Sequence, residues 1–310
     1  MNILSLLAAT VFAAETVISP LPDHNSPQPI QAIRDAGSTS SFGSLLQIAS
    51  PHPSLSPLAT PTLQEAGPTA MPTTTPEPIV TQGIIGKTRK PHIVIALLGD
   101  SMVDTLGSGV PALQKILTKE YPGVSFTILN YGVGATNLDY GIERLTQGYD
   151  YLGSHIPSLV SINPNVVIIE SFGYNPYALD LTTGLDKQWL ALAKATDTIR
   201  TELPQARVMI ASTIGPNASV FGDGAPGISL SASEKQERVR IIDAYLENAL
   251  RFAQSQKLPY SDAYHASLDV NGQGVLRYIN SNDHIHYSDA GRQLFSQKIA
   301  NTITDIHLLE

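Results

Sequence analysis

The sequence contains no cysteine among its 310 residues. This absence excludes disulfide bonds, thiolate catalysis, cysteine-ligated zinc and a lipid attached to an N-terminal cysteine. It leaves the cellular compartment open, because many exported proteins also contain no cysteine.

Clusters of basic residues are missing as well, and the formal net charge is −8. A nucleic-acid partner is therefore excluded, because phosphate binding requires grouped lysine and arginine side chains. Charged residues make up only 15% of the chain and hydrophobic residues 42%, so there is enough apolar material for a sizeable core.

No hydrophobic run is long enough to span a bilayer comfortably; the apolar stretch from Ile3 to Ala14 is the one near the N-terminus. Its length suits the core of a signal peptide, with small residues at Ala13 and Ala14 for cleavage. No lysine or arginine precedes Arg34, so a short uncleaved anchor is the alternative. We expect residues 1–15 to form a signal-peptide-like or anchor segment, and the protein to be secreted or tethered to a membrane or cell surface.

Aromatic residues are scarce in the following segment, where Phe42 is the single aromatic between Glu15 and Lys90. Residues 20–78 instead contain 12 of the 22 prolines, together with many serines and threonines. Such a composition buries too little apolar surface to offset the entropy of ordering the chain. The sequence predicts a disordered Pro/Ser/Thr-rich stalk over residues 16–90.

The composition changes at about residue 91, where continuous apolar runs begin. They cover Ile93–Leu98, Val166–Ile169 and Val208–Ala211, and Val124–Leu129 indicates a further strand. Strands that are apolar on both faces are typical of a parallel sheet covered by helices on both sides.

Helical patterns alternate with these strands. Ser231 and Glu234 have capping-box spacing, and the apolar residues Val239, Ile242, Leu246, Ala249 and Ala253 follow at helical spacing. Ser288 or Asp289 caps a final predicted helix with a stripe of Ala290, Leu294, Ile299 and Ile303. Residues 91–310 are therefore predicted to form one α/β sandwich.

The first chemically suggestive segment is Gly99-Asp100-Ser101, directly after the first predicted strand. A tight turn there exposes the Ser101 hydroxyl at the start of a helix, and the Ser101 N–H can face a developing oxyanion. A simple helix N-cap would use the same residue types, so the segment alone does not establish catalysis.

The second segment is Asp283-His284-Ile285-His286, close to the C-terminus. A serine nucleophile needs a base for its proton, and the base needs a carboxylate on its other ring nitrogen. Asp283 and His286, three positions apart, supply both groups from one loop.

The third set consists of strand-end turns rich in possible oxyanion donors. Gly173-Tyr174-Asn175 follows one strand, and Asn130-Tyr131-Gly132-Val133-Gly134 follows another. An asparagine amide and a backbone N–H aimed at one point would stabilise a tetrahedral intermediate.

The order and spacing of these blocks resemble the SGNH hydrolase family, also called GDSL esterases or lipases, over residues 92–306. The resemblance implies a three-layer α/β/α sandwich with a mainly parallel, flavodoxin-like sheet. It implies that Ser101 is the nucleophile, that Asp283 and His286 complete the triad, and that Gly134 and Asn175 join the Ser101 N–H as oxyanion donors. It implies no metal and no organic cofactor.

Two positions depart from the family pattern. Pro176 stands where an aspartate usually follows the asparagine of the third block. Many members also carry one more residue between the asparagine and the donor glycine of the second block, so the donor N–H belongs to either Gly134 or Ala135.

The expected function is a serine ester hydrolase that removes short acyl groups, for example O-acetyl groups, from extracellular or cell-wall carbohydrate or other small esters. O-acyl transfer by the same triad and a catalytically silent glycan-binding module are the alternatives. Residues 215–231, rich in Gly, Pro and Ser, are expected to form a loop beside the site.

Other readings of the motifs are weaker. The Gly-x-Ser-x-Gly elbow of α/β-hydrolases fails at Val103, and the dinucleotide fingerprint that begins at Gly132 fails at Asn137. A metal cluster of Asp283, His284, His286 and Asp289 would need a further strong ligand group.

Overall fold

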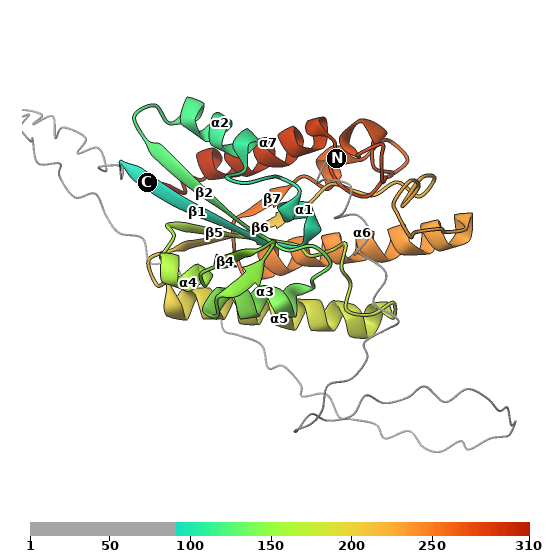
Figure 1. Ribbon diagram of the computed structural model, residues 1–310, viewed down its shortest axis with the longest axis horizontal. Helices are drawn as coiled ribbons and strands as arrows, with labels where there is room; N and C mark the ends of the chain where they lie inside the picture. The colour runs from blue at the N-terminus through green and yellow to red at the C-terminus, as the bar shows by residue number, and fades with distance from the viewer. Residues whose placement is uncertain (1–90) are drawn as a thin grey trace, which may run out of the picture. The chain divides into compact units, whose positions relative to one another are not determined.

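The computed structural model describes residues 91–310, which form a five-stranded parallel sheet with helices on both faces (Figure 1). The strands are β1 (His92–Gly99), β2 (Ser125–Gly132), β5 (Val166–Glu170), β6 (Arg207–Ser212) and β7 (Tyr260–Asp262). The helices are α1 (Ser101–Asp104), α2 (Pro111–Glu120), α3 (Leu138–Thr146), α4 (Leu159–Ile162), α5 (Leu181–Glu202), α6 (Ala232–Ser255) and α7 (Asp289–Asp305). The predicted segments 1–15 and 16–90 lie outside the described residues.

The strand order across the sheet is β2-β1-β5-β6-β7. Counting only these strands, the order is 2-1-3-4-5, the flavodoxin-like arrangement. β1 pairs along its whole length with β2, from His92 opposite Ser125 to Gly99 opposite Gly132. The predicted fold class is confirmed, and each of the four apolar runs is a strand. The short strand β7 was not predicted, because three residues carry too weak a pattern.

Helices α2 and α7 cover one face of the sheet, and α3 and α5 cover the other (Figure 1). Alternate residues of β1 supply the two cores: Ile93, Ile95 and Leu97 face one side, and Ala96 and Leu98 the other. Helix α6 lies beside β6 and contributes to both clusters. Burial of apolar side chains in two separate layers holds the sheet between them.

The two predicted helix starts are confirmed. The Ser231 hydroxyl accepts the Glu234 N–H at 3.3 Å, and the Glu234 carboxylate accepts the Ser231 N–H at 2.7 Å, which completes the capping box of α6. Ser288 is the N-cap of α7. The predicted stripe of α7 was partly wrong, because Ala290 is exposed in the first turn and Phe295 is buried in the core instead.

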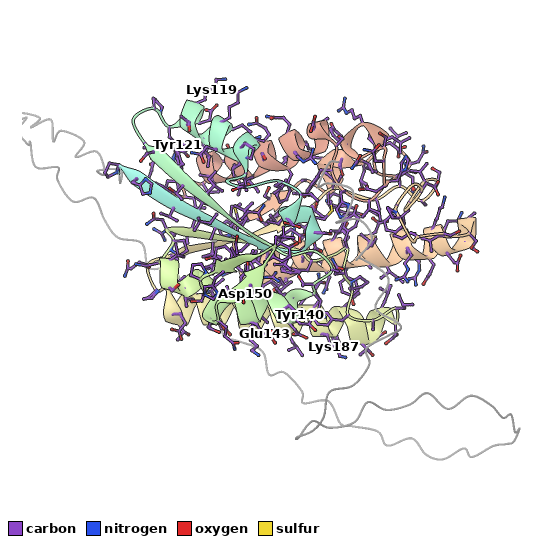
Figure 2. All side chains as sticks on the ribbon, viewed as in Figure 1. Lys119, Tyr121, Tyr140, Glu143, Asp150 and Lys187 are labelled. Atoms are coloured by element: carbon purple, nitrogen blue, oxygen red, sulfur yellow. The ribbon has the colours of Figure 1, made fainter. Side chains whose placement is uncertain are left out.

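A short antiparallel hairpin of β3 (Tyr149–Tyr151) and β4 (Ser154–Ile156) follows α3 and was not predicted. Asp150 of this hairpin lines one surface pocket together with Tyr140 and Glu143 of α3, all three labelled in Figure 2. Among residues 91–310, no helix is both long and apolar enough to cross a membrane.

Candidate active site

Ser101 is the first residue of α1 and directly follows the turn that ends β1. A side chain at Gly99 would place its Cβ 2.1 Å from a methyl carbon of Val103, so only glycine permits this turn. The Asp100 side chain caps α1 by accepting the Met102 N–H at 2.8 Å. The strand, the turn and the cap together place Ser101, only 4% exposed, at the carboxyl end of the sheet.

Asp283 and His286 form a buried pair in the loop that precedes α7. The Asp283 Oδ2 atom lies 3.0 Å from His286 Nδ1, and its Oδ1 accepts the backbone N–H groups of Ile285 and His286 at 2.9 and 3.0 Å. These bonds fix the loop and leave Nε2 facing away from the carboxylate. A carboxylate on Nδ1 favours the tautomer in which Nε2 is the basic nitrogen.

The electrostatics of the pair favour an ionised aspartate. Burial alone would raise the pKa of Asp283, but the hydrogen bond and charge of His286, with the two loop N–H groups, hold it below the ordinary value. The Nε2 atom of His286 is buried and has no hydrogen-bond partner within the described part of the chain. A buried nitrogen without a partner is available to accept a proton from a neighbouring group.

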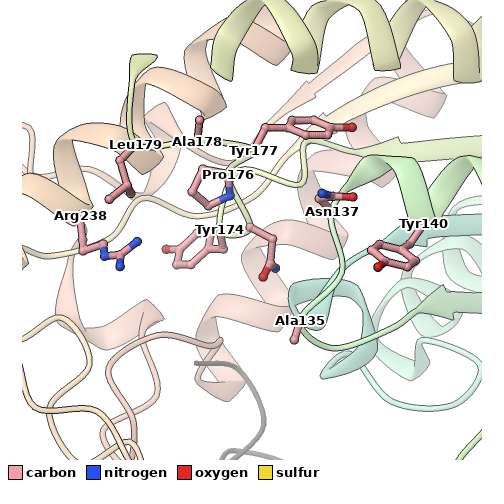
Figure 3. A pocket seen from close by; sticks show the side chains of 10 residues that line it. Ala135, Asn137, Tyr140, Tyr174, Pro176, Tyr177, Ala178, Leu179 and Arg238 are labelled. Carbon is pink, nitrogen blue, oxygen red and sulfur yellow. The ribbon is translucent and has the colours of Figure 1, made fainter. Parts of the chain in front are cut away.

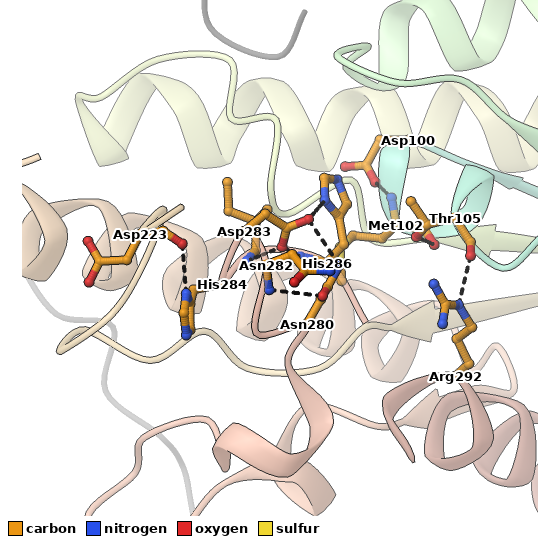
Figure 4. A network of polar contacts seen from close by, with 11 residues as sticks. Asp100, Met102, Thr105, Asp223, Asn280, Asn282, Asp283, His284, His286 and Arg292 are labelled. Atoms are coloured by element: carbon orange, nitrogen blue, oxygen red, sulfur yellow. Dashed lines mark hydrogen bonds and ion pairs between the residues drawn. The ribbon is translucent and has the colours of Figure 1, made fainter. Parts of the chain in front are cut away.

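His286 lies beside α1. Its charge lowers the pKa of Asp100, just before Ser101, and that of Asp104, one turn after it, against the larger effect of burial on each. Figure 4 shows the His286 ring near Asp100 and Met102. Arg292 in the first turn of α7 donates to the Thr105 carbonyl at 2.9 Å, which ties the helix after His286 to the end of α1. The structure therefore brings together segments nearly two hundred residues apart.

Asn175 is held against the serine turn. Its Nδ2 donates to Asp100 Oδ2 at 2.8 Å, and its backbone N–H bonds to the Phe172 carbonyl at 3.2 Å. An amide nitrogen has two hydrogens, so one remains for a substrate oxygen. Phe172 is buried with a φ of 52°, so the loop before Asn175 is held in a conformation that a bulky residue rarely adopts.

The residues from Asn130 to Gly134, at the end of β2, have two kinds of role. Some hold α1 in place, and others are candidate oxyanion donors. Asn130 donates to the Val103 and Gly107 carbonyls at 2.8 and 3.0 Å, so it holds α1 and does not reach the site. A Cβ on Gly132 would lie 2.1 Å from the Asp104 nitrogen, which shows how closely β2 approaches α1. A Cβ built on Gly134 would lie 4.0 Å from Ser101 Cβ, so Gly134 is adjacent to the serine.

The choice between Gly134 and Ala135 as donor stays open. The Gly134 N–H already bonds to the Tyr151 hydroxyl at 3.3 Å. Ala135 has a φ of 56° and lines the same pocket as Asn175. A non-glycine residue in this left-handed region is strained, and such residues cluster at functional sites.

Four supporting side chains were missed by the sequence interpretation: Asp104, Arg144, Tyr151 and Glu170. The Tyr151 hydroxyl donates to Asp104 at 2.8 Å while accepting the Gly134 N–H. Arg144 is 4% exposed and donates to the Gly99 carbonyl at 2.8 Å. Only Asp104, one turn after Ser101, and Glu170, a charge ending an apolar strand, had a detectable signal.

Glu170 links the serine turn to the asparagine loop. It accepts the Phe172 N–H at 2.9 Å, the Ser171 hydroxyl, and the Asp100 backbone N–H. Burial, and then the neighbouring Asp100 charge, raise the pKa of Glu170 well above its usual range. The two loops are therefore held through one buried carboxyl group.

His284 does not join His286. Its Nδ1 lies 2.7 Å from the Asp223 carbonyl oxygen, in the loop of residues 213–231 (Figure 4). That loop contains no helix or strand, and a Cβ on Gly224 would lie 2.4 Å from the Asn282 carbonyl, so it packs against the histidine loop as expected. In the part of the chain that the structure describes, no three His, Asp or Glu side chains are arranged to hold a metal ion.

The sequence matches the model of a known protein family. The family model described as GDSL-like Lipase/Acylhydrolase matches residues 95–299. No curated protein sequence matches the chain.

Two solved structures are among those that match the chain. A candidate GDSL-like lipase from Parabacteroides merdae is 18% identical, with 70% of this chain and 96% of that chain covered and a TM-score of 0.50. An acetylxylan esterase from Geobacillus stearothermophilus is 16% identical, with 68% and 94% covered and a TM-score of 0.49.

Proposed function

This chain belongs to the family of GDSL-like lipases and acylhydrolases and is a carboxylic ester hydrolase, and we propose that it acts through an acyl-enzyme on Ser101. The observation that supports this assignment most directly is the Asp283–His286 pair beside α1, with His286 Nε2 buried and without a partner among the described residues. Asp283 orients the imidazole, and His286 supplies the base that Ser101 needs.

In the proposed reaction, the Ser101 Oγ attacks the ester carbonyl while His286 Nε2 takes its proton. The carbonyl oxygen becomes an oxyanion, which accepts hydrogen bonds from the Ser101 N–H, from Asn175 Nδ2 and from the N–H of Gly134 or Ala135. The imidazolium then protonates the leaving alcohol. Water then attacks the acyl-enzyme with His286 as its base, and the acid is released as Ser101 takes back its proton.

We also propose that the substrates carry short acyl groups, such as O-acetyl groups on extracellular or cell-wall carbohydrate. The composition of residues 1–90 supports this location, because an apolar segment followed by a Pro/Ser/Thr-rich stretch suits a catalytic domain held outside the cell. Comparing the protein in culture medium, membranes and cytosol tests the location.

Hydrolysis of p-nitrophenyl acetate by the full chain tests the mechanism. Ser101→Ala and His286→Ala should each lower kcat by about 10⁴-fold or more, because triad members act as a unit. Two matched controls are available: Ser108→Ala, an exposed serine after α1, and His284→Asn, the neighbouring histidine that bonds to Asp223. Wild-type turnover in either triad variant would refute the assignment, whereas both controls should stay within about 2-fold of wild type.

A further inference from the structure

The loop of residues 133–136, between β2 and α3, carries both candidate backbone donors, Gly134 and Ala135. Ala135 also lines, with Asn175, a surface pocket of about 320 Å³ (Figure 3). Its φ of 56° lies in the left-handed region, where a residue with a side chain is strained. Such a conformation persists only where the surrounding structure holds it, so the contacts of this loop decide where its N–H groups lie relative to Ser101.

The side chain of Arg144, on α3, joins this loop to the turn before Ser101. Its Nη1 donates to the Thr136 hydroxyl at 3.1 Å, and its Nη2 donates to the Gly99 carbonyl at 2.8 Å. The Thr136 hydroxyl in turn donates to the Val133 carbonyl at 2.8 Å, which closes the loop on itself. One planar guanidinium group therefore fixes the distance between the donor loop and the serine turn.

The same loop is also attached to α1. The Gly134 N–H donates to the Tyr151 hydroxyl at 3.3 Å, and that hydroxyl donates to Asp104 of α1 at 2.8 Å. Tyr149 of the same hairpin has its ring centre 5.8 Å from the Arg144 Cζ atom, within range of a cation–π contact. The hairpin therefore supports both the loop and the guanidinium group.

Arg144 is a buried charge on an otherwise apolar helix face. It is 4% exposed, and Leu138, Ile142 and Leu145 are buried from the same helix. None of the ion pairs among residues 91–310 includes Arg144, and its Nε is buried without a hydrogen-bond partner in that part of the chain. A buried charge without a paired carboxylate destabilises the fold, whereas a neutral side chain would fill the same space at a lower cost. The charge itself therefore points to a role in the reaction.

The positive charge of Arg144 acts on the residues around Ser101. Burial raises the pKa of Asp100 and that of Asp104, and the charge of Arg144 opposes this effect on both carboxyl groups. Asp100 and Asp104 flank Ser101 in the chain, so the field of the guanidinium reaches the place where the ester carbonyl would gain negative charge. Water screens such a field only weakly in a buried site.

We propose that Arg144 is a positioning residue of the hydrolysis: its guanidinium holds the donor loop against the serine turn, and its charge favours the oxyanion over the neutral ester carbonyl. This inference rests on the proposed function. An interaction that strengthens only as the oxyanion forms lowers the barrier without tightening substrate binding, so its loss should appear in kcat and not in KM. A lysine keeps the charge but loses the planar fork that reaches two acceptors.

Hydrolysis of p-nitrophenyl acetate by the full chain tests this role. Arg144→Met should lower kcat about 10- to 100-fold, the effect of losing charge-assisted hydrogen bonds, with KM within about 3-fold of wild type. Arg144→Lys should fall between the two. Arg240→Met is the matched control and should stay within about 2-fold, because Arg240 is exposed on α6 and paired with Glu237 at 2.6 Å. Denaturant unfolding establishes that each variant is folded, and Arg144→Lys decides the question if Arg144→Met is not.

A transition-state analogue separates this role from a purely structural one. A trifluoromethyl ketone forms a tetrahedral oxyanion on a serine, so Arg144→Met should weaken its inhibition by about the same factor as it lowers kcat/KM. A kcat within about 2-fold of wild type, a loss confined to KM, or unchanged inhibition beside a reduced kcat would overturn the proposal. Wild-type turnover of Ser101→Ala would instead refute the acyl-enzyme mechanism, whatever Arg144→Met shows.

Discussion

At the scale of single residues, the site depends on polar groups that bond to each other before any substrate arrives. Asp100 caps α1, accepts Asn175 and is fully buried, and burial raises the pKa of its carboxyl despite the hydrogen bond from Asn175. Ser101, α1 and Asn175 are thus oriented by one carboxyl group. Pro176, where the family usually has an aspartate, lines the pocket and leaves the Asn175–Asp100 bond intact.

Asn175→Ala tests the donor role at this scale. Loss of an oxyanion donor is expected to lower kcat by about 10²- to 10³-fold, because the hydrogen bond strengthens as charge develops in the transition state. KM for p-nitrophenyl acetate should change far less. Since Asn175 also bonds to Asp100, thermal unfolding of the variant must be measured alongside. Asn301→Ala, an exposed asparagine of α7, is the control. A kcat within a few-fold of wild type would remove Asn175 from the donor set.

At the scale of elements, each chemical group follows the end of a strand or precedes the start of a helix. β1 leads to Ser101, β2 to Gly134 and β5 to Asn175, while His286 precedes α7. Parallel pairing of these strands places their carboxyl ends at one edge of the sheet. The order of the strands, and not the distance along the chain, therefore decides which groups meet.

Ser288→Ala tests how α7 supports the histidine loop. The Ser288 hydroxyl accepts the Gly291 N–H at 3.1 Å and donates to the Arg277 carbonyl at 2.5 Å. Loss of an N-cap serine is expected to lower the free energy of unfolding by about 1 kcal/mol. Denaturant unfolding measures this effect, and Ser154→Ala in β4 is the control because its side chain is exposed. A variant as stable as wild type would show that the cap contributes nothing to holding α7.

At the scale of the whole molecule, buried acids make stability depend on pH. Asp243 of α6 has its Oδ1 buried with no hydrogen-bond partner among residues 91–310. Burial raises the pKa of Asp243 from 3.8 to about 6, against the opposing hydrogen bond from Tyr264. Between pH 3.8 and about pH 6, the Asp243 carboxyl is mostly ionised in the unfolded chain and mostly protonated in the folded chain. This group therefore makes the folded state less stable as the pH rises from about 4 to about 6.

Asp243→Asn removes this titration while keeping an acceptor for Tyr264. Relative to wild type, the variant should gain about 2 kcal/mol of stability between pH 4 and pH 7. Denaturant unfolding at several pH values provides the measurement. Asp197→Asn on α5, whose side chain is 76% exposed, is the control, and its difference from wild type should not vary with pH. A pH-independent difference for Asp243→Asn would contradict the raised pKa.

The amino-acid sequence by itself determined the type of fold, because runs apolar on both faces are stable only inside a covered parallel sheet. It also singled out Ser101, Asn175, Asp283 and His286, because the Gly-Asp-Ser, Gly-x-Asn and Asp-x-x-His motifs that contain them are each short enough to be recognised in the sequence. Only the tertiary structure decided what surrounds them. Tyr151 reaches Gly134 and Asp104 from an unforeseen hairpin, and Arg144 and Arg238 approach the site from helices far away in the chain. These contacts depend on how helices pack across a sheet, and no local pattern encodes that geometry.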